Sequence, residues 1–231
     1  MQFPPPDHRF LRFWTDEYPS HQRPDIWREV LSHMLLKVDL KLLPEEPFRI
    51  EATLRALSGI RFGTGKFSAT IHSRTREIAT ADNDDVLLVI NLEGPLSIAL
   101  DGSELAVREG DACLLSCAQA FDLLRPVSGR LVLARIERVR IETFLPNVKQ
   151  HIGQTILRGN EALRHLTTVL LKLDDHQTLE SDELRQTITA HIFNVLALAL
   201  TASRPGEAIR PPERPAETRL STIQKYITQH V

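Results

Sequence analysis

The chain has 231 residues, of which 42% are hydrophobic and 25% are charged, proportions that are ordinary for a globular protein. A chain of this length can build one hydrophobic core with a smaller attached element. Because the formal net charge is only -2 and the pI is near 6.5, the chain as a whole offers no general attraction for the phosphate backbone of nucleic acids.

The cysteines and the apolar runs indicate a protein of the cytoplasm. Cys113 and Cys117 are not spaced as C-x-x-C, so we expect small buried hydrophobic side chains rather than a redox pair or a zinc site. Residues 1–13 contain no uninterrupted apolar segment of the kind found in secretory signals. The longest apolar runs, such as 86–92 and 195–200, are too short to cross a bilayer, so no membrane contact is expected.

Residues 1–24 are rich in proline and aromatic side chains and are expected to form an arm rather than a packed element. Pro24 is typical of the first turn of a helix. Apolar side chains then recur at helical spacing at positions 26, 27, 30, 31, 34 and 35. We expect this helix to lie on the outside of a sheet.

From residue 38 to residue 136 the hydrophobic pattern alternates instead. Alternation over 48–57, 60–67, 70–76 and 96–100 predicts half-buried strands, and the continuous apolar run 86–90 predicts a strand buried on both faces. Asp101-Gly102 is typical of a tight hairpin, since both central residues of a type I′ turn need positive φ. Many short strands separated by turns predict a β-barrel or jelly roll.

After residue 136 the pattern becomes helical and stays so. We expect helices over 138–145 and 161–173, and a third that begins after Ser181 as N-cap and runs to about residue 203. The third helix carries an apolar stripe broader than one packed surface needs, so it either packs within its own subunit or is shared with a second one. We predict a homodimer whose interface is formed by Leu184, Ile188, Ile192, Val195, Leu196 and Ala199.

The remaining residues form two short segments of different character. Residues 204–217 combine prolines with charges, a composition that stays extended and predicts a linker. Residues 218–231 restart an amphipathic helix whose apolar face has nothing further in the chain to pack against.

Small-molecule binding inside the barrel is the chemistry that the strands favour. Such a pocket has apolar walls with a few polar groups that orient the ligand. Polar residues in phase with apolar neighbours are the candidates: His72, Arg74, Asn91, Gln119 and Arg135. The alternatives are a solvated outer face for His72 and Arg74, a satisfied buried amide for Asn91 and a salt bridge for Arg135. If the arginines point inward, an effector that carries a carboxylate is the natural guest.

The order of these elements is similar to that of the AraC/XylS family of transcription regulators, and in particular of those whose sensor is an AraC-binding-like domain. Arg23-Pro-Asp-Ile-Trp-Arg-Glu-Val-Leu31 resembles the family's early tryptophan helix. His72-Ser-Arg-Thr-Arg76 resembles its basic strand, which precedes the turn Asp82-Asn-Asp-Asp85. Arg108-Glu-Gly-Asp-Ala-Cys-Leu-Leu115 resembles a turn and strand of its barrel, and Arg219-Leu-Ser-Thr-Ile-Gln-Lys-Tyr-Ile227 is similar to the first helix of its DNA-binding domain.

The resemblance implies an α+β fold, a cupin-like β-barrel or jelly roll with an N-terminal helix and C-terminal dimerisation helices. It divides the chain into an arm, helix and ligand-binding barrel over 1–137, a helical dimerisation region over 138–203, a linker over 204–217 and the first helix of an incomplete DNA-binding domain over 218–231. It implies a small-molecule effector, a homodimer, and DNA contact only through a helix-turn-helix domain that this chain lacks. We therefore expect the sensing and dimerising portion of a transcription regulator.

Metal and catalytic chemistry are not favoured. Metal-holding cupin barrels use an H-x-H pair with later ligands, and the 9 histidines of this chain include no such pair. The sequence also contains no G-x-S-x-G, P-loop or G-x-G-x-x-G motif. We predict no metal, no cofactor and no enzymatic activity. A metal-free cupin enzyme acting on a small polar molecule and a purely structural dimerisation module stay open as alternatives.

Overall fold

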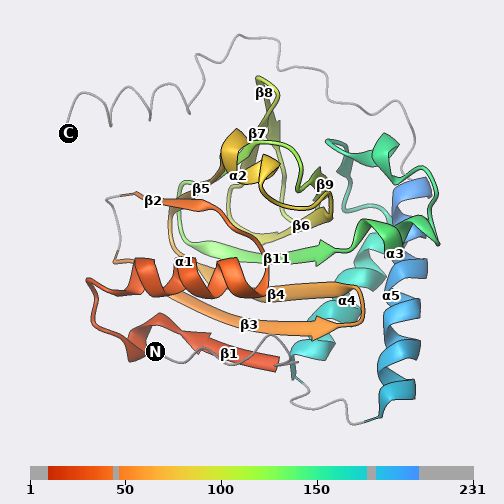
Figure 1. The fold of residues 1–231 in the computed structure, drawn as a ribbon, viewed down its shortest axis with the longest axis horizontal. Helices are drawn as coiled ribbons and strands as arrows, with labels where there is room; N and C mark the ends of the chain where they lie inside the picture. The colour runs from red at the N-terminus through yellow and green to blue at the C-terminus, as the bar shows by residue number, and fades with distance from the viewer. Residues whose placement is uncertain (1–9, 44–46, 176–180, 203–231) are drawn as a thin grey trace.

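The computed structural model describes residues 10–43, 47–175 and 181–202, which fold into two antiparallel sheets flanked by helices (Figure 1). Within these residues, the seven-stranded sheet has the order β1 (Phe10–Trp14), β3 (Ile50–Leu57), β4 (Ile60–Phe67), β11 (Gly129–Ile136), β6 (Val86–Glu93), β9 (Ala112–Ser116) and β12 (Thr155–Ile156). The five-stranded sheet has the order β2 (Asp39–Leu42), β5 (Thr70–Arg74), β10 (Phe121–Arg125), β7 (Ser97–Leu100) and β8 (Ser103–Ala106). Neighbouring strands pair antiparallel, as in a jelly roll.

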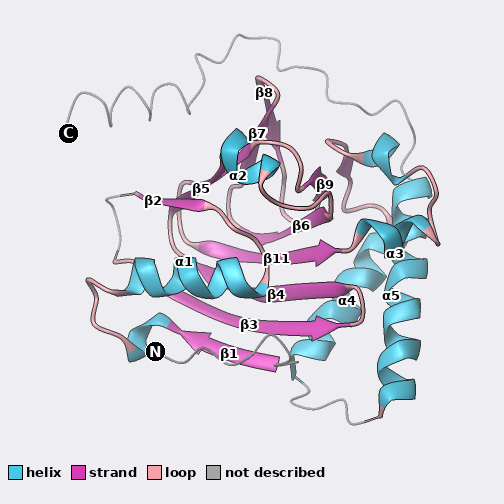
Figure 2. Ribbon diagram, in the orientation of Figure 1, coloured by secondary structure: helices cyan, strands magenta, loops and turns pink. Residues whose placement is uncertain are grey.

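Strands predominate up to residue 136 and helices after it, as Figure 2 shows. The helices are α1 (Arg23–Met34), α2 (Arg76–Thr80), α3 (Arg138–Glu142), α4 (Glu161–Asp175) and α5 (Asp182–Ala202), with short 3-10 turns at Thr15–Glu17 and Val148–His151. No helix among the described residues is long and apolar enough to span a membrane.

The space between the two sheets forms the first core. Inward side chains of both sheets and the apolar face of α1 belong to one buried cluster, in which Trp27 packs beside Phe13 and Phe67. The helix predicted after Pro24 therefore exists, but its apolar face is part of the barrel interior rather than of an outer layer. Helix α1 therefore closes one side of the barrel, and the side chains inside the barrel are apolar except at the positions described below.

A second core lies on the outer face of the seven-stranded sheet. Side chains of α3, α4 and α5 pack there against outward residues of the sheet, and α4 and α5 lie side by side (Figure 1). Strand β6 belongs to both cores, because Leu87 and Val89 face the interior whereas Leu88 and Ile90 face the helices. The prediction of a strand buried on both faces is confirmed.

Local sequence signals are confirmed where they were strongest. Asp101 and Gly102 both have positive φ, 50° and 77°, and connect β7 to β8. The hydroxyl of Ser181 accepts a hydrogen bond from the backbone N–H of Leu184 at 3.2 Å, so Ser181 caps α5 as predicted. Both cysteines are buried, and burial raises the pKa of Cys113 to about 12 and that of Cys117 to about 11. The α+β class is confirmed.

Two segments differ from expectation. Phe10–Trp14, predicted as part of an unpacked arm, forms edge strand β1, paired with β3, because Phe13 can bury its ring in the interior while the backbone completes the sheet edge. The strand predicted over 70–76 ends at Arg74, because Thr75 begins α2 instead: its hydroxyl caps the helix by accepting a hydrogen bond from the N–H of Ile78. The rest of the predicted arm (1–9), the linker (204–217) and the last helix (218–231) lie outside the described residues.

The predicted dimer stripe divides between two faces of α5. Ile192, Leu196 and Ala199 are fully buried in the second core and Val195 nearly so, so these four are already covered by their own subunit. Of the six predicted interface residues, only Leu184 (47% exposed) and Ile188 (partly buried) are open to a partner. Leu198, which was not predicted, is 60% exposed. Most of the stripe therefore has an intramolecular role.

Candidate functional site

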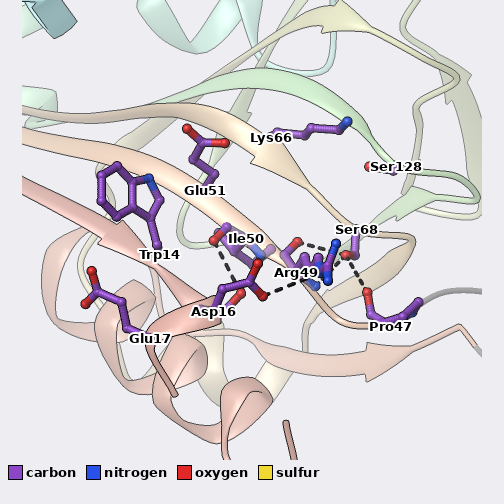
Figure 3. A pocket seen from close by; sticks show the side chains of 11 residues that line it. Trp14, Asp16, Glu17, Pro47, Arg49, Ile50, Glu51, Lys66, Ser68 and Ser128 are labelled. Carbon is purple, nitrogen blue, oxygen red and sulfur yellow. Dashed lines mark hydrogen bonds and ion pairs between the residues drawn. The ribbon is translucent and has the colours of Figure 1, made fainter. Parts of the chain in front are cut away.

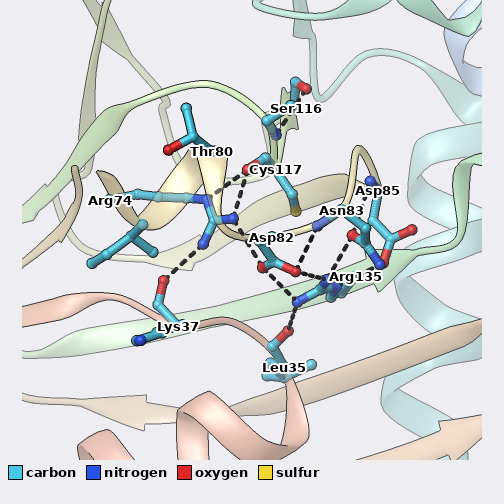
Figure 4. Close-up of polar contacts among 12 residues, drawn as sticks. Leu35, Lys37, Arg74, Thr80, Asp82, Asn83, Asp85, Ser116, Cys117 and Arg135 are labelled. Atoms are coloured by element: carbon cyan, nitrogen blue, oxygen red, sulfur yellow. Dashed lines mark hydrogen bonds and ion pairs between the residues drawn. The ribbon is translucent and has the colours of Figure 1, made fainter. Parts of the chain in front are cut away.

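Polar side chains lie inside the barrel at both of its ends. At the end nearer the C-terminus of α1, they form a network of ion pairs and hydrogen bonds (Figure 4). Asp82 accepts hydrogen bonds from Nη2 of Arg74 at 2.9 Å and from Nη2 of Arg135 at 2.8 Å. Arg135 also donates through Nε to Asp85 at 2.8 Å. The carbonyl of Cys117 accepts from Nε of Arg74 at 2.8 Å. The network joins β5, β11 and the turn that precedes β6.

The same arginines fasten α1 to the barrel. Nη1 of Arg74 donates to the carbonyl of Lys37 at 2.8 Å, and Nη1 of Arg135 donates to that of Leu35 at 3.1 Å. All guanidinium nitrogens of both arginines thus have acceptors within the protein. Neither arginine therefore has a guanidinium nitrogen left unpaired for the predicted ligand. The alternative of a salt bridge for Arg135 is confirmed.

Electrostatics support a permanent network. Burial alone would raise the pKa of Asp82, but hydrogen bonds from Arg135, the backbone of Asn83 and Arg74 lower it to about 2. Burial likewise opposes the charge on Arg135, and its bonds to Asp82 and Asp85 raise its pKa above the ordinary value. Asp82 and Arg135 are therefore both charged at neutral pH.

The other end of the barrel contains a buried arginine of a different kind. Arg125 follows Phe121 and Leu123 in phase on β10 and is 1% exposed. Its Nη1 donates to the carbonyl of Glu93, on the opposite sheet, at 2.9 Å. Its Nε and Nη2 are buried and have no hydrogen-bond partner in the part of the chain that the structure describes. Desolvation lowers the pKa of Arg125 to about 10, which still leaves it charged at neutral pH.

Two glycines make room for this guanidinium. A Cβ at Gly129 would lie 2.1 Å from Nη1 of Arg125 and 2.3 Å from the carbonyl oxygen of Glu93, closer than any side chain can approach. Gly94 turns the chain after β6 with φ +84°, and its Cβ would be 3.4 Å from the same Nη1. Arg125 therefore crosses from one sheet to the other through a gap that only these small residues leave.

His72 stands next to Arg125 on the neighbouring strand. Its register partner is Leu123, and Arg125 pairs with Thr70, so His72 and Arg125 are diagonal neighbours on the interior face. The Thr70 hydroxyl lies 3.5 Å from Nδ1 of His72. Desolvation, with a smaller contribution from the Arg125 charge, lowers the pKa of His72 to about 4. The imidazole is therefore neutral at physiological pH.

The strand register places His72 on the interior face of its sheet. Its Cα partners are Leu40 on β2 and Leu123 on β10, and both leucines pack in the first core. The residue itself is partly buried. The solvated outer face that was an alternative for His72 is thus not its position.

The remaining predicted site residues lie apart. Asn91 is fully buried, and its amide nitrogen donates at 2.8 Å to the carbonyls of Gly94 and Val107, which holds the turn beside Arg125. Its Oδ1 has no partner among the described residues. Gln119 follows the Cys117 turn near the ion network, and its buried Oε1 is likewise unpartnered within the described chain.

Sequence reasoning missed Arg125 and Trp27. The alternation Phe121, Leu123, Arg125 is the same signal that selected Asn91 and Arg135, and it could have identified Arg125. Trp27 was assigned to packing alone, yet its buried Nε1 also has no acceptor in the described structure. Both are donors inside the barrel.

A groove opens on the surface at the Arg125 end of the barrel (Figure 3). Its volume is about 940 Å³, and its walls include the charged side chains of Asp16, Arg49, Glu51 and Lys66. Ser128, also in its lining, directly precedes Gly129. Among the described residues, no group of three or more histidine, cysteine, aspartate or glutamate side chains could hold a metal ion.

Residues 27–201 match the family model of the AraC-binding-like domain. The chain belongs to this family. Among solved structures, this AraC-binding-like domain is similar to the AraC-like transcriptional activator CuxR, with a TM-score of 0.69 and 15% identity over 95% of this chain and 78% of that one. No curated protein sequence matches it significantly.

Two further solved structures align with less of the AraC-binding-like domain. A putative ethanolamine utilization protein Q from Salmonella typhimurium has a TM-score of 0.32 and 12% identity over 44% of this chain and 96% of its own. An RmlC-like cupin from Shewanella frigidimarina has a TM-score of 0.32 and 10% identity over 43% of this chain and 83% of its own. The expected cupin-like fold is shown by the likeness to CuxR together with the two antiparallel sheets.

Proposed function

We propose that this AraC-binding-like domain is the effector-sensing and dimerising part of a cytoplasmic transcription regulator. The proposal depends on one observation above all: buried polar atoms of Arg125, Asn91 and Trp27 inside the barrel have no partner within the described chain. Leaving such groups unpaired lowers stability, and a bound small molecule would pair them. The family and the likeness to an AraC-like activator support a regulatory use of that binding.

Strand β6 offers a route from effector to dimer. Its inward residues, ending in Asn91, line the barrel, while Leu88 and Ile90 pack on the helical layer. A ligand that binds the inner face of β6 and displaces the strand would therefore also displace the outer surface against which α4 and α5 pack. This is a population shift driven by the ligand's different affinity for two arrangements.

The proposed dimer contact is the outer edge of α5. Leu184, Ile188, His191 and Leu198 follow one another at steps of four, three and seven residues, which is the spacing of a coiled-coil seam. Val195 continues this spacing but already packs in the second core. Leu184 and Leu198 are the exposed members at its two ends. We propose that a second copy of the chain covers this seam.

Binding rather than catalysis is proposed. The cysteines carry raised pKa values, so neither is a thiolate at neutral pH. The Thr70 hydroxyl beside His72 donates its hydrogen bond to the carbonyl of Ser68 at 3.1 Å. A regulator would contact DNA through a helix-turn-helix unit rather than through this barrel.

The test is sedimentation velocity on the purified chain, with and without metabolites first selected because they raise its melting temperature. We expect a dimer whose association constant changes with the selected compound. Leu198→Asp should yield monomers, whereas Val139→Asp, at a still more exposed position on α3, should not. A monomer at all concentrations, or a dimer that responds to no stabilising compound, would refute the proposed function.

A further inference from the structure

We propose that the effector bears a carboxylate, and that the free edge of the Arg125 guanidinium binds it inside the barrel. This deepens the proposed function by naming the chemical class of the ligand. Three features carry the inference: which nitrogens of Arg125 are unpaired, what surrounds them, and how the second buried arginine of the same sheet differs.

The two unpaired nitrogens of Arg125 are positioned to bind both oxygens of one carboxylate. Nη1 lies on the same side of the guanidinium as Cδ and is engaged by the carbonyl of Glu93. Nε and Nη2 form the opposite edge, where two N–H bonds point in the same direction, and both are unpartnered within the described chain. A carboxylate presents two oxygens at matching spacing and accepts both bonds at once. A neutral hydroxyl or carbonyl group would pair only one of them well.

The surroundings compensate the positive charge of Arg125 only in part. No acidic side chain forms an ion pair with it among the described residues, and Glu93, which raises its pKa, contacts it through the backbone and is itself exposed. Burying a cation without an anion is costly, so an anionic ligand gains attraction that an exposed arginine could not provide. Neutral His72 beside it adds a hydrogen-bonding group without adding a second charge.

Arg74 supplies an internal comparison. It lies on β5, next to β10, and is also 1% exposed, yet Asp82 and two backbone carbonyls occupy all its nitrogens. The protein therefore satisfies one buried arginine completely from its own groups and leaves the fork of the other open. That contrast assigns Arg74 to structure and Arg125 to ligand binding.

The experiment measures melting temperatures of the full chain with acetate, succinate and benzoate, each against its uncharged amide at equal ionic strength, and with inorganic phosphate. We expect at least one carboxylate to raise the melting temperature by about 3 °C near saturation. The amides should have little effect. Stabilisation by phosphate alone would assign the site to a phosphate-bearing effector and overturn the carboxylate assignment.

Two methionine variants complete the test. Arg125→Met should melt at or above the wild-type temperature and lose the response to carboxylate. Arg74→Met should melt about 6 °C or more below wild type but keep that response. Equal carboxylate responses in wild type and Arg125→Met would overturn the inference, as would an equal loss of stability in both variants. Should Arg125→Met not fold, Arg125→Lys, which keeps the charge but not the fork, is expected to weaken the response at least tenfold in concentration.

These experiments distinguish failure of the carboxylate inference from failure of the proposed function. A neutral compound that stabilises wild type and Arg125→Met alike and alters dimerisation would overturn the carboxylate inference while supporting the sensor. Conversely, carboxylate binding that depends on Arg125 but never changes dimerisation would support the site and count against the regulatory role.

Discussion

Asp82 links the two fully paired arginines, and its replacement by asparagine is expected to lower the free energy of unfolding by about 2 to 3 kcal/mol. The fall of its pKa from 3.8 to about 2 corresponds to about 2.4 kcal/mol, at about 1.36 kcal/mol per unit. Removing one partner of a buried ion pair typically costs about 3 to 5 kcal/mol. Because the side chain of Asp82 is 23% exposed and both arginines keep other acceptors, the lower end applies.

Urea unfolding followed by circular dichroism at pH 7 measures this difference between wild type and Asp82→Asn. The matched control is Asp25→Asn, which removes a carboxylate paired with Arg28 at 2.7 Å but 75% exposed. Exposed pairs contribute little, so the control should lose under about 1 kcal/mol. If Asp82→Asn loses no more than the control, the network does not hold this end of the barrel together.

The same variant tests the sign of the pH dependence. Because the folded protein lowers the pKa of Asp82, its contribution is complete above pH 3.8 and is lost as the pH falls towards 2. The stability difference between wild type and Asp82→Asn should therefore shrink over that window. A difference that stays constant down to pH 2 would show that the shape of the carboxylate matters, and not its charge.

Three further predictions concern the Arg125 end and the dimer. Because folding lowers the pKa of His72 from 6.5 to about 4, wild type should lose up to about 3 kcal/mol as the pH falls across that range, and His72→Gln should lose correspondingly less in the same urea titration. Gly129→Ala should cost about 2 kcal/mol by overpacking against Arg125 and abolish the carboxylate response, whereas Gly159→Ala, with open space around its Cβ, should leave both unchanged. Leu198→Asp should produce monomers without lowering the melting temperature of the subunit; unchanged dimers in sedimentation would show that this helix edge is not the contact.

Several features follow from local chemistry and were accessible from the sequence. The Asp101-Gly102 turn needs two residues that tolerate positive φ, and Ser181 satisfies the first free N–H groups of α5 whatever surrounds it. The double burial of β6 follows from an uninterrupted apolar run. Each of these was indicated by a short stretch of consecutive residues.

The candidate site was predicted only in part, because alternation shows which face a side chain shares but not which partners it finds there. His72 and Asn91 were selected correctly as interior groups, and Arg74 and Arg135 shared the same signal. Asp82 and Asp85 reach the latter two from a turn at the head of β6, which no spacing rule could place against β5 and β11 at once. Arg125 was passed over although it shows the same alternation.

The amino-acid sequence by itself determined the order of elements, the jelly-roll character of residues 38–136 and the tight turns, since these arise from side-chain period and local backbone preference. Only the tertiary structure decided that Phe10–Trp14 is a strand, that the apolar stripe of α5 mostly faces inward, and that one buried arginine is left with a free edge. Those outcomes depend on which surfaces meet across the barrel. Burial and pairing are properties of two surfaces in contact, and a single segment specifies only one of them.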